Sequence, residues 1–251
     1  MVLLLFVDFD PDLAALRPLG GFFVLRATGE PLRPPATLAQ TYARSALPDN
    51  QDPLELRVRK VGHALRARER RVAASIAQQG LAARLWSIAL GCAALYDAVP
   101  DLDPRLLRWD PDGSAPDDLW LTDVRPLPAD AATVADVVLH GHLEPLNAAL
   151  GSRYRVADGL LRGNAGSALA GAARQLDQWA RAHGRTDVAA RTRALTVELL
   201  AHPLLAGTGT LTAAGFRRRS CCLYYRVPGG GVCGDCCFTR APRSSPHAPS
   251  G

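Results

Sequence analysis

Five cysteines near the C-terminus form the densest group of metal-binding side chains in the sequence. They are Cys221, Cys222, Cys233, Cys236 and Cys237, so the spacing is C-C-x10-C-x2-C with a further cysteine directly behind it. In a reducing compartment, cysteines this close together are more often metal ligands than a disulfide framework. Thiolates bind either zinc or the irons of an iron–sulfur cluster, so these two kinds of site are the first candidates.

The adjacent pair Cys221 and Cys222 helps to choose between them. A structural zinc ion needs four ligands on one tetrahedron, usually from two C-x2-C knuckles, and only Cys233 and Cys236 form such a knuckle here. Neighbouring residues of an extended strand point to opposite faces, so the backbone would have to turn sharply to bring the adjacent thiolates to one ion. A [2Fe–2S] cluster spreads four thiolate positions over two irons. The spacing therefore favours an iron–sulfur cluster and leaves zinc as the alternative.

Glycines and arginines surround the cysteines. Gly229–Gly231 and Gly234 carry no side chain and permit positive φ, which lets the backbone wrap closely and point N–H groups at sulfur. Arg217, Arg218 and Arg219 precede the adjacent cysteines, and their charge would stabilise thiolates and the electron gained on reduction. A solvated basic turn is the alternative interpretation of the same arginines.

The elements that must position this segment are expected to be mainly helical. Apolar residues recur at helical steps over 54–76 and again over 81–98, with Gly80 between the two patterns. Cys92 lies on the apolar face of the second pattern and is therefore expected in the core.

Three further helices are expected before the cysteines. One spans 133–150, with Thr133 as its N-cap. Another starts at an Asn164 cap and ends near His183, and the last starts at a Thr186 cap.

Short strands are expected at 22–25 and 119–124, and a small, Thr- and Gly-rich linker at 206–214. The fold class is therefore α+β, predominantly α-helical, with a few short strands and a small C-terminal cysteine-bearing iron–sulfur module. The expected parts are a mainly helical domain over residues 1–205, the module over 206–240 and a disordered Pro/Ser-rich tail over 241–251.

Charge and hydrophobicity exclude several classes of protein. The formal net charge is only +5, from 29 basic and 24 acidic residues, and basic and aromatic residues are not interleaved along one face, so nucleic-acid binding is not expected. No apolar run reaches the roughly 18 residues of a membrane span. The apolar start, residues 1–7, lacks a basic n-region and a cleavage site. We expect a cytoplasmic protein, which could also lie against the inner face of a membrane.

A second group of metal-ligand residue types, His140, His142 and Glu144, is weaker. Residues two apart on a helix do not face each other, so the three side chains make a poor single site there.

At the cysteines the chain resembles the FhuF-type ferric siderophore reductases. The pattern Cys221-Cys222-x10-Cys233-x2-Cys236 matches the C-terminal signature of that family, and an adjacent pair with this loop length is unusual among iron–sulfur motifs. Cys237 is additional to the four-ligand pattern.

The resemblance extends upstream and covers roughly residues 50 to 240. Segments 73–75, 83–86, 142–146 and 163–168 are similar to the central helices and later segments of the family. Family members often carry Trp before the Gly-Asn pair, where this chain has Arg162.

The resemblance implies a cytoplasmic [2Fe–2S] protein with Cys221, Cys222, Cys233 and Cys236 as cluster ligands. Such a protein takes one electron from a donor such as a ferredoxin or a flavin reductase and passes it to the Fe(III) of a ferric siderophore, which releases Fe(II). Many ferric siderophores are anionic, so Arg217, Arg218 and Arg219 are candidates for a basic rim that binds the substrate.

Two other functions remain open at this point. The cysteines could form a zinc ribbon that binds nucleic acid or protein, with arginines holding the partner. An iron–sulfur cluster could also serve a regulatory sensor. Metal and sulfide content separates the first alternative from a reductase, and turnover with a ferric chelate separates the second.

Overall fold

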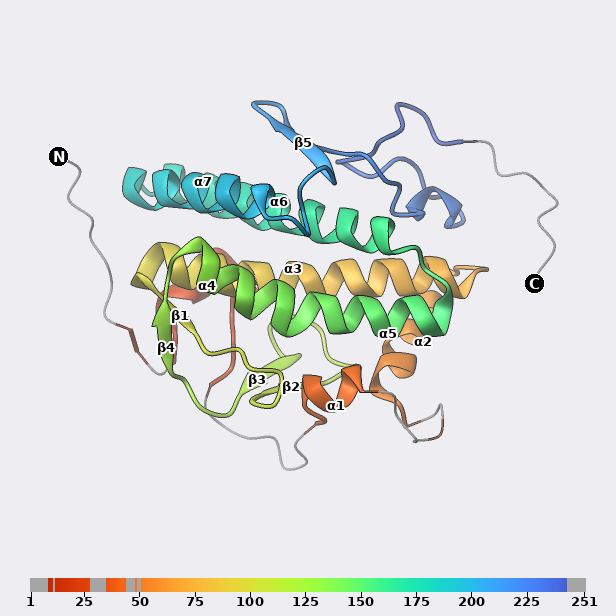
Figure 1. Ribbon diagram of the computed structural model, residues 1–251, viewed down its shortest axis with the longest axis horizontal. Coiled ribbons are helices and arrows are strands. Elements are labelled where there is room, and N and C mark those ends of the chain that lie inside the picture. The colour runs from red at the N-terminus through yellow and green to blue at the C-terminus, as the bar shows by residue number, and fades with distance from the viewer. Residues whose placement is uncertain (1–8, 11, 28–34, 44–47, 49–50, 243–251) are drawn as a thin grey trace.

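The computed structural model describes a predominantly helical α+β fold, which confirms the expected fold class. It covers residues 9–10, 12–27, 35–43, 48 and 51–242. The expected tail at 241–251 and the apolar start at 1–7 therefore lie almost wholly outside the described residues. Figure 1 shows two long helices running side by side along the molecule, with short sheets below them and the cysteine segment above.

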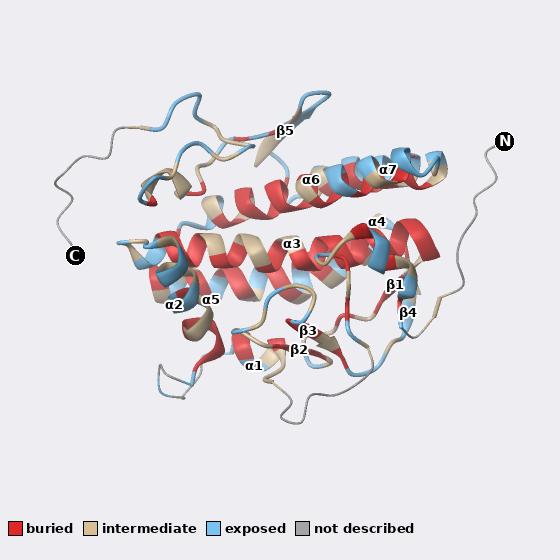
Figure 2. Ribbon diagram, turned by 180° about the vertical axis from the view of Figure 1, so that it is seen from behind, coloured by how far each residue is buried: buried red, intermediate tan, exposed pale blue. Residues whose placement is uncertain are grey.

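The central helix is α3, which runs from Arg70 to Tyr96 and is buried over most of its length (Figure 2). A helix that is apolar all round belongs in the interior of a core. Gly80 lies inside α3 and does not interrupt it, contrary to the expectation from sequence. A glycine inside a helix costs about 1 kcal/mol, which the burial of the neighbouring apolar side chains outweighs.

The break between the first two helices lies upstream of Gly80, between Arg66 and Glu69. Helix α2 (Pro53–Leu65) begins at Asp52, whose carboxylate accepts hydrogen bonds from the first backbone N–H groups, and ends where Arg66 turns left-handed with φ 50°. Cys92 of α3 is fully buried, as expected for a core residue.

The second long helix, α6 (Asp158–Ala182), packs against α3 along much of its length. It starts before Asn164, which is wholly buried inside the helix and is not its cap. The helix ends at His183, and Gly184 follows with φ 68°, the left-handed conformation typical of a residue after a helix end.

The remaining helices cover the flanks of this pair. The expected helix at 133–150 is three consecutive pieces, and its N-cap is Asp130, which accepts a hydrogen bond from the Thr133 N–H. Thr186 is the first residue of its helix and does not cap it. These helical elements are α1 (Leu38–Tyr42), α4 (Ala131–Ala135), the π-helix η2 (Asp136–Leu143), α5 (Glu144–Tyr154) and α7 (Thr186–Ala201), with short 3-10 turns η1 (Ala14–Leu19) and η3 (Tyr224–Arg226).

Strands form three two-stranded antiparallel sheets within the described chain. The pairs are β1 (Ala98–Pro100) with β4 (Pro126–Pro128), β2 (Leu107–Trp109) with β3 (Leu119–Leu121), and β5 (Gly209–Thr212) with β6 (Gly215–Arg218).

Two of the expected strand and loop assignments are wrong. Residues 22–25 form no strand, because the chain turns at 21–23 and pairs only through an isolated bridge from Arg26. The expected linker 206–214 contains β5, which pairs with β6 around a turn where Gly215 has φ 123°. The expected strand at 119–124 is shorter and ends at Leu121.

No helix in the described part of the chain is long and apolar enough to cross a membrane. The division into residues 1–205 and 206–240 stays a prediction, although the β5–β6 hairpin begins close to the expected boundary.

Candidate metal centre

The β5–β6 hairpin brings the cysteine segment onto α6, and two glycines of α6 make the close approach possible. A Cβ atom on Gly163 would collide with the Ser220 hydroxyl, and one on Gly166 would lie 2.7 Å from Thr208 Oγ1. Both contacts are too short for any side chain. Glycine at these helix positions therefore lets the segment that begins at Ser220 lie directly on the helix.

A buried chain of hydrogen bonds joins this segment to both long helices. Arg218 Nη2 of β6 donates to Asn164 Oδ1 of α6 at 2.6 Å. Asn164 Nδ2 donates to the carbonyl oxygen and the hydroxyl of Ser75 in α3, at 2.9 and 3.1 Å. The Ser75 hydroxyl donates in turn to the carbonyl oxygen of Cys222 at 2.8 Å. The backbone of the adjacent cysteine pair is thus attached to the core of the protein.

Asp235 attaches the C-x2-C knuckle in the same way. Its carboxylate accepts a hydrogen bond of 2.6 Å from the Ser167 hydroxyl of α6 and lies 3.6 Å from a guanidinium nitrogen of Arg174. Its carbonyl oxygen accepts the backbone N–H of Arg218 at 3.0 Å. Since Asp235 lies between Cys233 and Cys236, these contacts fix the knuckle against α6 and β6.

A third attachment runs from the other end of the segment to the start of α3. Arg226 forms an ion pair of 2.7 Å with Glu69, the N-cap residue of α3, and lies over the Tyr225 ring. Tyr225 also meets Phe238 edge to face, with ring centroids 5.9 Å apart. Tyr225 therefore packs within the cysteine segment itself, in a partly exposed aromatic contact.

The cysteines lie in the loops after β6, which are mostly half-buried or exposed (Figure 2). Cys222 is buried and the other four are half-buried. The thiols of Cys222 and Cys233 lie 3.5 Å apart, close to the roughly 3.8 Å that separates two sulfurs on one tetrahedral metal with bonds of about 2.3 Å. Both halves of the motif therefore meet at one place, with a left-handed turn at Leu223 redirecting the chain after the adjacent pair.

Backbone N–H groups point at two of the sulfurs. The Leu223 N–H donates to Cys221 Sγ at 3.3 Å, and the Phe238 N–H donates to Cys236 Sγ at 3.4 Å. Hydrogen bonds of this kind to thiolates help to set the potential of an iron–sulfur cluster. In the described residues, no three Cys, His, Asp or Glu side chains gather around one point that could hold a single metal ion.

The thiols of Cys221 and Cys233 are protonated at neutral pH unless a metal binds. Burial, with smaller contributions from neighbouring thiols, raises the pKa of Cys221 to about 11 and that of Cys233 to about 12. The charge of Arg218 acts in the opposite direction on the pKa of Cys233. Metal binding must therefore release protons, as it does in other thiolate sites.

Unpartnered donors beside the cysteines fit an iron–sulfur cluster. Arg218 Nε and Nη1 and the Ser220 hydroxyl are buried and have no hydrogen-bond partner. Buried polar atoms without partners are uncommon, and these three belong to residues just before the adjacent cysteine pair, so acceptors bound at the cysteines would satisfy them. Thiolate and sulfide sulfurs are such acceptors, and the donor set of cysteine sulfurs is the one that binds these clusters.

Of the three arginines proposed for a basic rim, two have side chains at the surface, and the rim itself stays a prediction. Arg217 and Arg219 are exposed, but Arg218 is only 2% exposed and cannot contact a docked substrate. The prediction for Arg218 was therefore wrong, because side chains alternate along β6 and its own points inward.

The second group of histidines does not form a site. His142 is wholly buried between the Tyr42 hydroxyl, at 2.9 Å from Nδ1, and the carbonyl oxygen of Leu102, at 2.6 Å from Nε2. His140 instead pairs with Glu144 at the surface. The two rings therefore have separate partners, as the helical spacing indicated.

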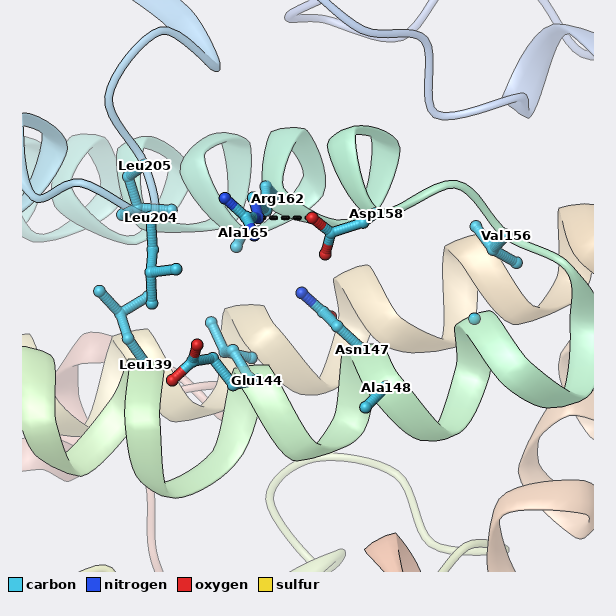
Figure 3. A pocket seen from close by; sticks show the side chains of 12 residues that line it. Leu139, Glu144, Asn147, Ala148, Val156, Asp158, Arg162, Ala165, Leu204 and Leu205 are labelled. Carbon is cyan, nitrogen blue, oxygen red and sulfur yellow. Dashed lines mark ion pairs between the residues drawn. The ribbon is translucent and has the colours of Figure 1, made fainter.

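A cavity of about 260 Å³ lies between η2–α5 and α6 (Figure 3). Leucines such as Leu139 and Leu204 form part of its wall, while Asn147 and an ion pair of 2.7 Å between Arg162 and Asp158 line its polar side. No cysteine lines this cavity.

Sequence reasoning missed the residues that hold the cysteine segment in place. Asn164 was expected as a helix cap and Ser75 as part of a helix, and Ser167 and Asp235 received no role. The only signal for three of them was that they lie in segments similar to the FhuF-type family.

Comparison with known families agrees with this geometry. Residues 218–238 match the family described as the FhuF 2Fe-2S C-terminal domain. The matched segment begins at Arg218 and contains all five clustered cysteines. No curated protein matches the chain. The resemblance at the cysteines is confirmed, and the cofactor of this segment is a [2Fe–2S] cluster.

Proposed function

We propose that this protein is a ferric siderophore reductase that adds one electron to siderophore-bound Fe(III) and so releases Fe(II) in the cytoplasm. The observation that carries the proposal is the FhuF-type 2Fe-2S domain at residues 218–238, in which four of the five clustered cysteines are half-buried and Cys222 is buried. Cys221, Cys222, Cys233 and Cys236 are the proposed cluster ligands.

The electron count of the proposed reaction is simple. A reduced ferredoxin or flavin reductase loses one electron, and the ferric ion of the substrate gains it. No bond within the siderophore breaks. The bound [2Fe–2S] cluster supplies the one-electron centre between donor and acceptor.

The chemistry of the substrate explains why one electron is enough. Siderophores hold Fe(III) through hard oxygen donors, whereas Fe(II) is softer and less charged and is held far more weakly by the same donors. The reaction therefore needs no general acid or base. It needs a redox centre near the surface and a surface that attracts the chelate.

The residues around the cysteines suit those two needs. The half-buried Cys221, Cys233 and Cys236 place the metal-binding sulfurs near the surface. The exposed side chains of Arg217 and Arg219 would attract anionic chelates, whose approach a basic surface accelerates. Close approach matters because electron transfer requires the two metal centres to be near each other.

A single-turnover reaction tests this function. The protein is purified without oxygen, reduced with dithionite, desalted, and mixed with a ferric trihydroxamate chelate and a chromophoric Fe(II) chelator. We expect about one Fe(II) for each reduced cluster, together with return of the oxidised visible spectrum. The Cys222→Ser variant is the control and should release no Fe(II).

The outcome separates the proposed function from its alternatives. A loaded cluster that stays reduced with both ferric trihydroxamate and ferric tris-catecholate chelates would contradict the reductase proposal and leave a sensor. A colourless protein that contains zinc and no sulfide would instead support the zinc-ribbon alternative.

A further inference from the structure

Arg218 is a buried charge with an incomplete set of partners. Its side chain is only 2% exposed, although arginine is almost never buried without a partner for its charge. Nη2 donates to Asn164 Oδ1 at 2.6 Å and to the Leu160 carbonyl oxygen at 3.4 Å. Nε and Nη1 have no partner, and among the described residues no carboxylate pairs with this guanidinium. Its positive charge is therefore not neutralised by the protein part of the molecule.

Asp235, the acidic residue nearest to Arg218 in the sequence, is engaged elsewhere. Asp235 accepts the Arg218 backbone N–H on its carbonyl oxygen, while its carboxylate takes the Ser167 hydroxyl and lies near Arg174. The chain thus keeps this acid away from the Arg218 guanidinium. A buried cation without an anion is destabilising, so a negative charge bound close by would stabilise the folded protein.

The cysteines are where that negative charge arises. The Arg218 backbone N–H donates to the carbonyl oxygen of Asp235, which lies between Cys233 and Cys236. Its guanidinium is linked through Asn164 and Ser75 to the carbonyl oxygen of Cys222. Two ferric irons and two sulfides carry two positive charges, so four thiolates leave a net charge of two minus, and reduction adds a third. A fixed cation beside this site favours the reduced state.

We propose that Arg218 is the counter-charge of the [2Fe–2S] cluster, that its Nε–H and Nη1–H groups donate to sulfur atoms of the site, and that it thereby raises the reduction potential. This assigns to Arg218 a role different from substrate docking. The inference rests on the cluster, and it does not depend on which acceptor takes the electron.

The two long helices hold the guanidinium in position. Asn164 accepts from Arg218 while donating to Ser75, and Ser75 donates to the backbone of Cys222. Gly163 leaves room for the guanidinium, since a Cβ there would lie 3.2 Å from Arg218 Nη2. Because these contacts are buried and mutually satisfied, the orientation of Nε and Nη1 is fixed before the cluster binds.

The reduction potential is the direct test. Wild type, Arg218→Gln and Arg218→Lys are loaded with cluster, assayed for iron and sulfide, and titrated with dithionite against mediators. We expect Arg218→Gln to lower the reduced-to-oxidised ratio at a given potential at least tenfold, which corresponds to about 59 mV for a one-electron couple. Arg240→Gln, which alters an exposed arginine of the same segment, should change the ratio less than twofold, because solvent and salt screen its charge.

The lysine variant keeps the test informative if Arg218→Gln does not load. A lysine retains the charge but replaces the planar fork of the guanidinium with a single compact ammonium, which does not reproduce the separate directions of Nη2 towards Asn164 and of Nε and Nη1 towards the sulfurs. We expect its ratio to fall at least threefold. A fully loaded Arg218→Gln variant with the wild-type potential would overturn the proposal. If Arg218→Gln does not load, a fully loaded Arg218→Lys variant with the wild-type potential would overturn it.

Isotope labelling gives a readout that a purely structural role would not produce. Protein labelled with 15N only in the arginine guanidinium groups is reduced and measured by pulsed EPR. We expect a weak 15N coupling to the reduced cluster in wild type and in Arg240→Gln, and its loss in Arg218→Lys. A coupling that persists unchanged in Arg218→Lys would also overturn the assignment.

Discussion

The hydroxyl of Ser75 donates a hydrogen bond of 2.8 Å to the carbonyl oxygen of Cys222, although the two residues are 147 positions apart. Ser75 lies near the start of α3 and Cys222 in the adjacent cysteine pair. Their contact shows that the metal centre is built on the helical core and is not confined to a free-standing loop. Changes in α3 and α6 should therefore alter the metal centre without touching a cysteine.

Replacing Ser75 with alanine tests this dependence directly. The variant leaves the buried carbonyl of Cys222 and one donor bond of Asn164 unsatisfied, which costs about 1–3 kcal/mol. We expect iron to be lost to a chelator about tenfold faster than from wild type, measured by the decay of visible absorbance. Ser152→Ala removes a hydroxyl bonded within α5 and should leave the rate unchanged. Equal rates for both variants would show that the contact does not hold the centre together.

Gly163 and Gly171 both lie in α6 and offer a matched comparison. In Gly163→Ala the new methyl group would collide with Ser220, so the cysteine segment must move away from α6. In Gly171→Ala it would meet no atom within 4 Å and should stabilise the helix by up to about 1 kcal/mol.

Iron and sulfide assays and thermal unfolding check this pair. Gly163→Ala should lose most of its cluster, whereas Gly171→Ala should keep a full cluster and unfold at the same or a higher temperature. A full cluster in Gly163→Ala would mean that the segment is not docked on α6 as the structure has it.

Local sequence patterns predicted which residues make up the metal centre better than they predicted which residues hold it in place. The cysteine spacing and the flanking glycines lie within one short stretch of sequence, so they could be recognised without knowledge of the fold. The helical periodicity could be recognised for the same reason, but the position of the break between α2 and α3 could not. Gly80 interrupts the apolar pattern, yet tertiary burial keeps α3 continuous through it.

The docking residues could not be predicted because their partners are distant in sequence. Asn164 is a good helix cap by residue type, and only the fold places it between Ser75 and Arg218. Three consecutive arginines look alike as a basic run, and only the alternation along β6 separates the buried one from its exposed neighbours. Long-range contacts decide both cases.

Serine substitutions test the proposed ligand set. Cys221→Ser, Cys222→Ser, Cys233→Ser and Cys236→Ser should each lose most of the iron and sulfide, because a thiolate ligand is removed. Cys237→Ser should keep about two irons and two sulfides, since its thiol is additional to the four-ligand pattern.

The buried Cys92 provides the folding control for this series. It lies in the core of α3, where burial raises its thiol pKa, and Cys92→Ser should reduce stability but keep the cluster. A Cys237→Ser protein without cluster, paired with a Cys236→Ser protein that retains it, would exchange the roles of these two cysteines.

The buried His142 should make stability depend on pH. Burial lowers its pKa to about 4, although the Leu102 carbonyl opposes this by accepting the Nε2 proton. The unfolded chain, with a His pKa near 6.5, therefore binds a proton at a higher pH than the folded chain does. Stability is fully present above pH 6.5 and falls as the pH drops from there towards 4. Between pH 7.5 and 5.5 the loss from this one residue should be about 1 kcal/mol.

Urea unfolding of wild type and His142→Gln at pH 7.5 and 5.5 measures this contribution as a difference. The variant cannot titrate at this position, so we expect it to be less stable than wild type at pH 7.5 and to lose about 1 kcal/mol less on acidification. His63→Gln, which alters an exposed histidine of α2, should follow the wild-type pH dependence. If His142→Gln and wild type lost equal stability between the two pH values, His142 would not be held neutral between Tyr42 and Leu102. The hydrogen-bonding assignment of its ring would then be incorrect.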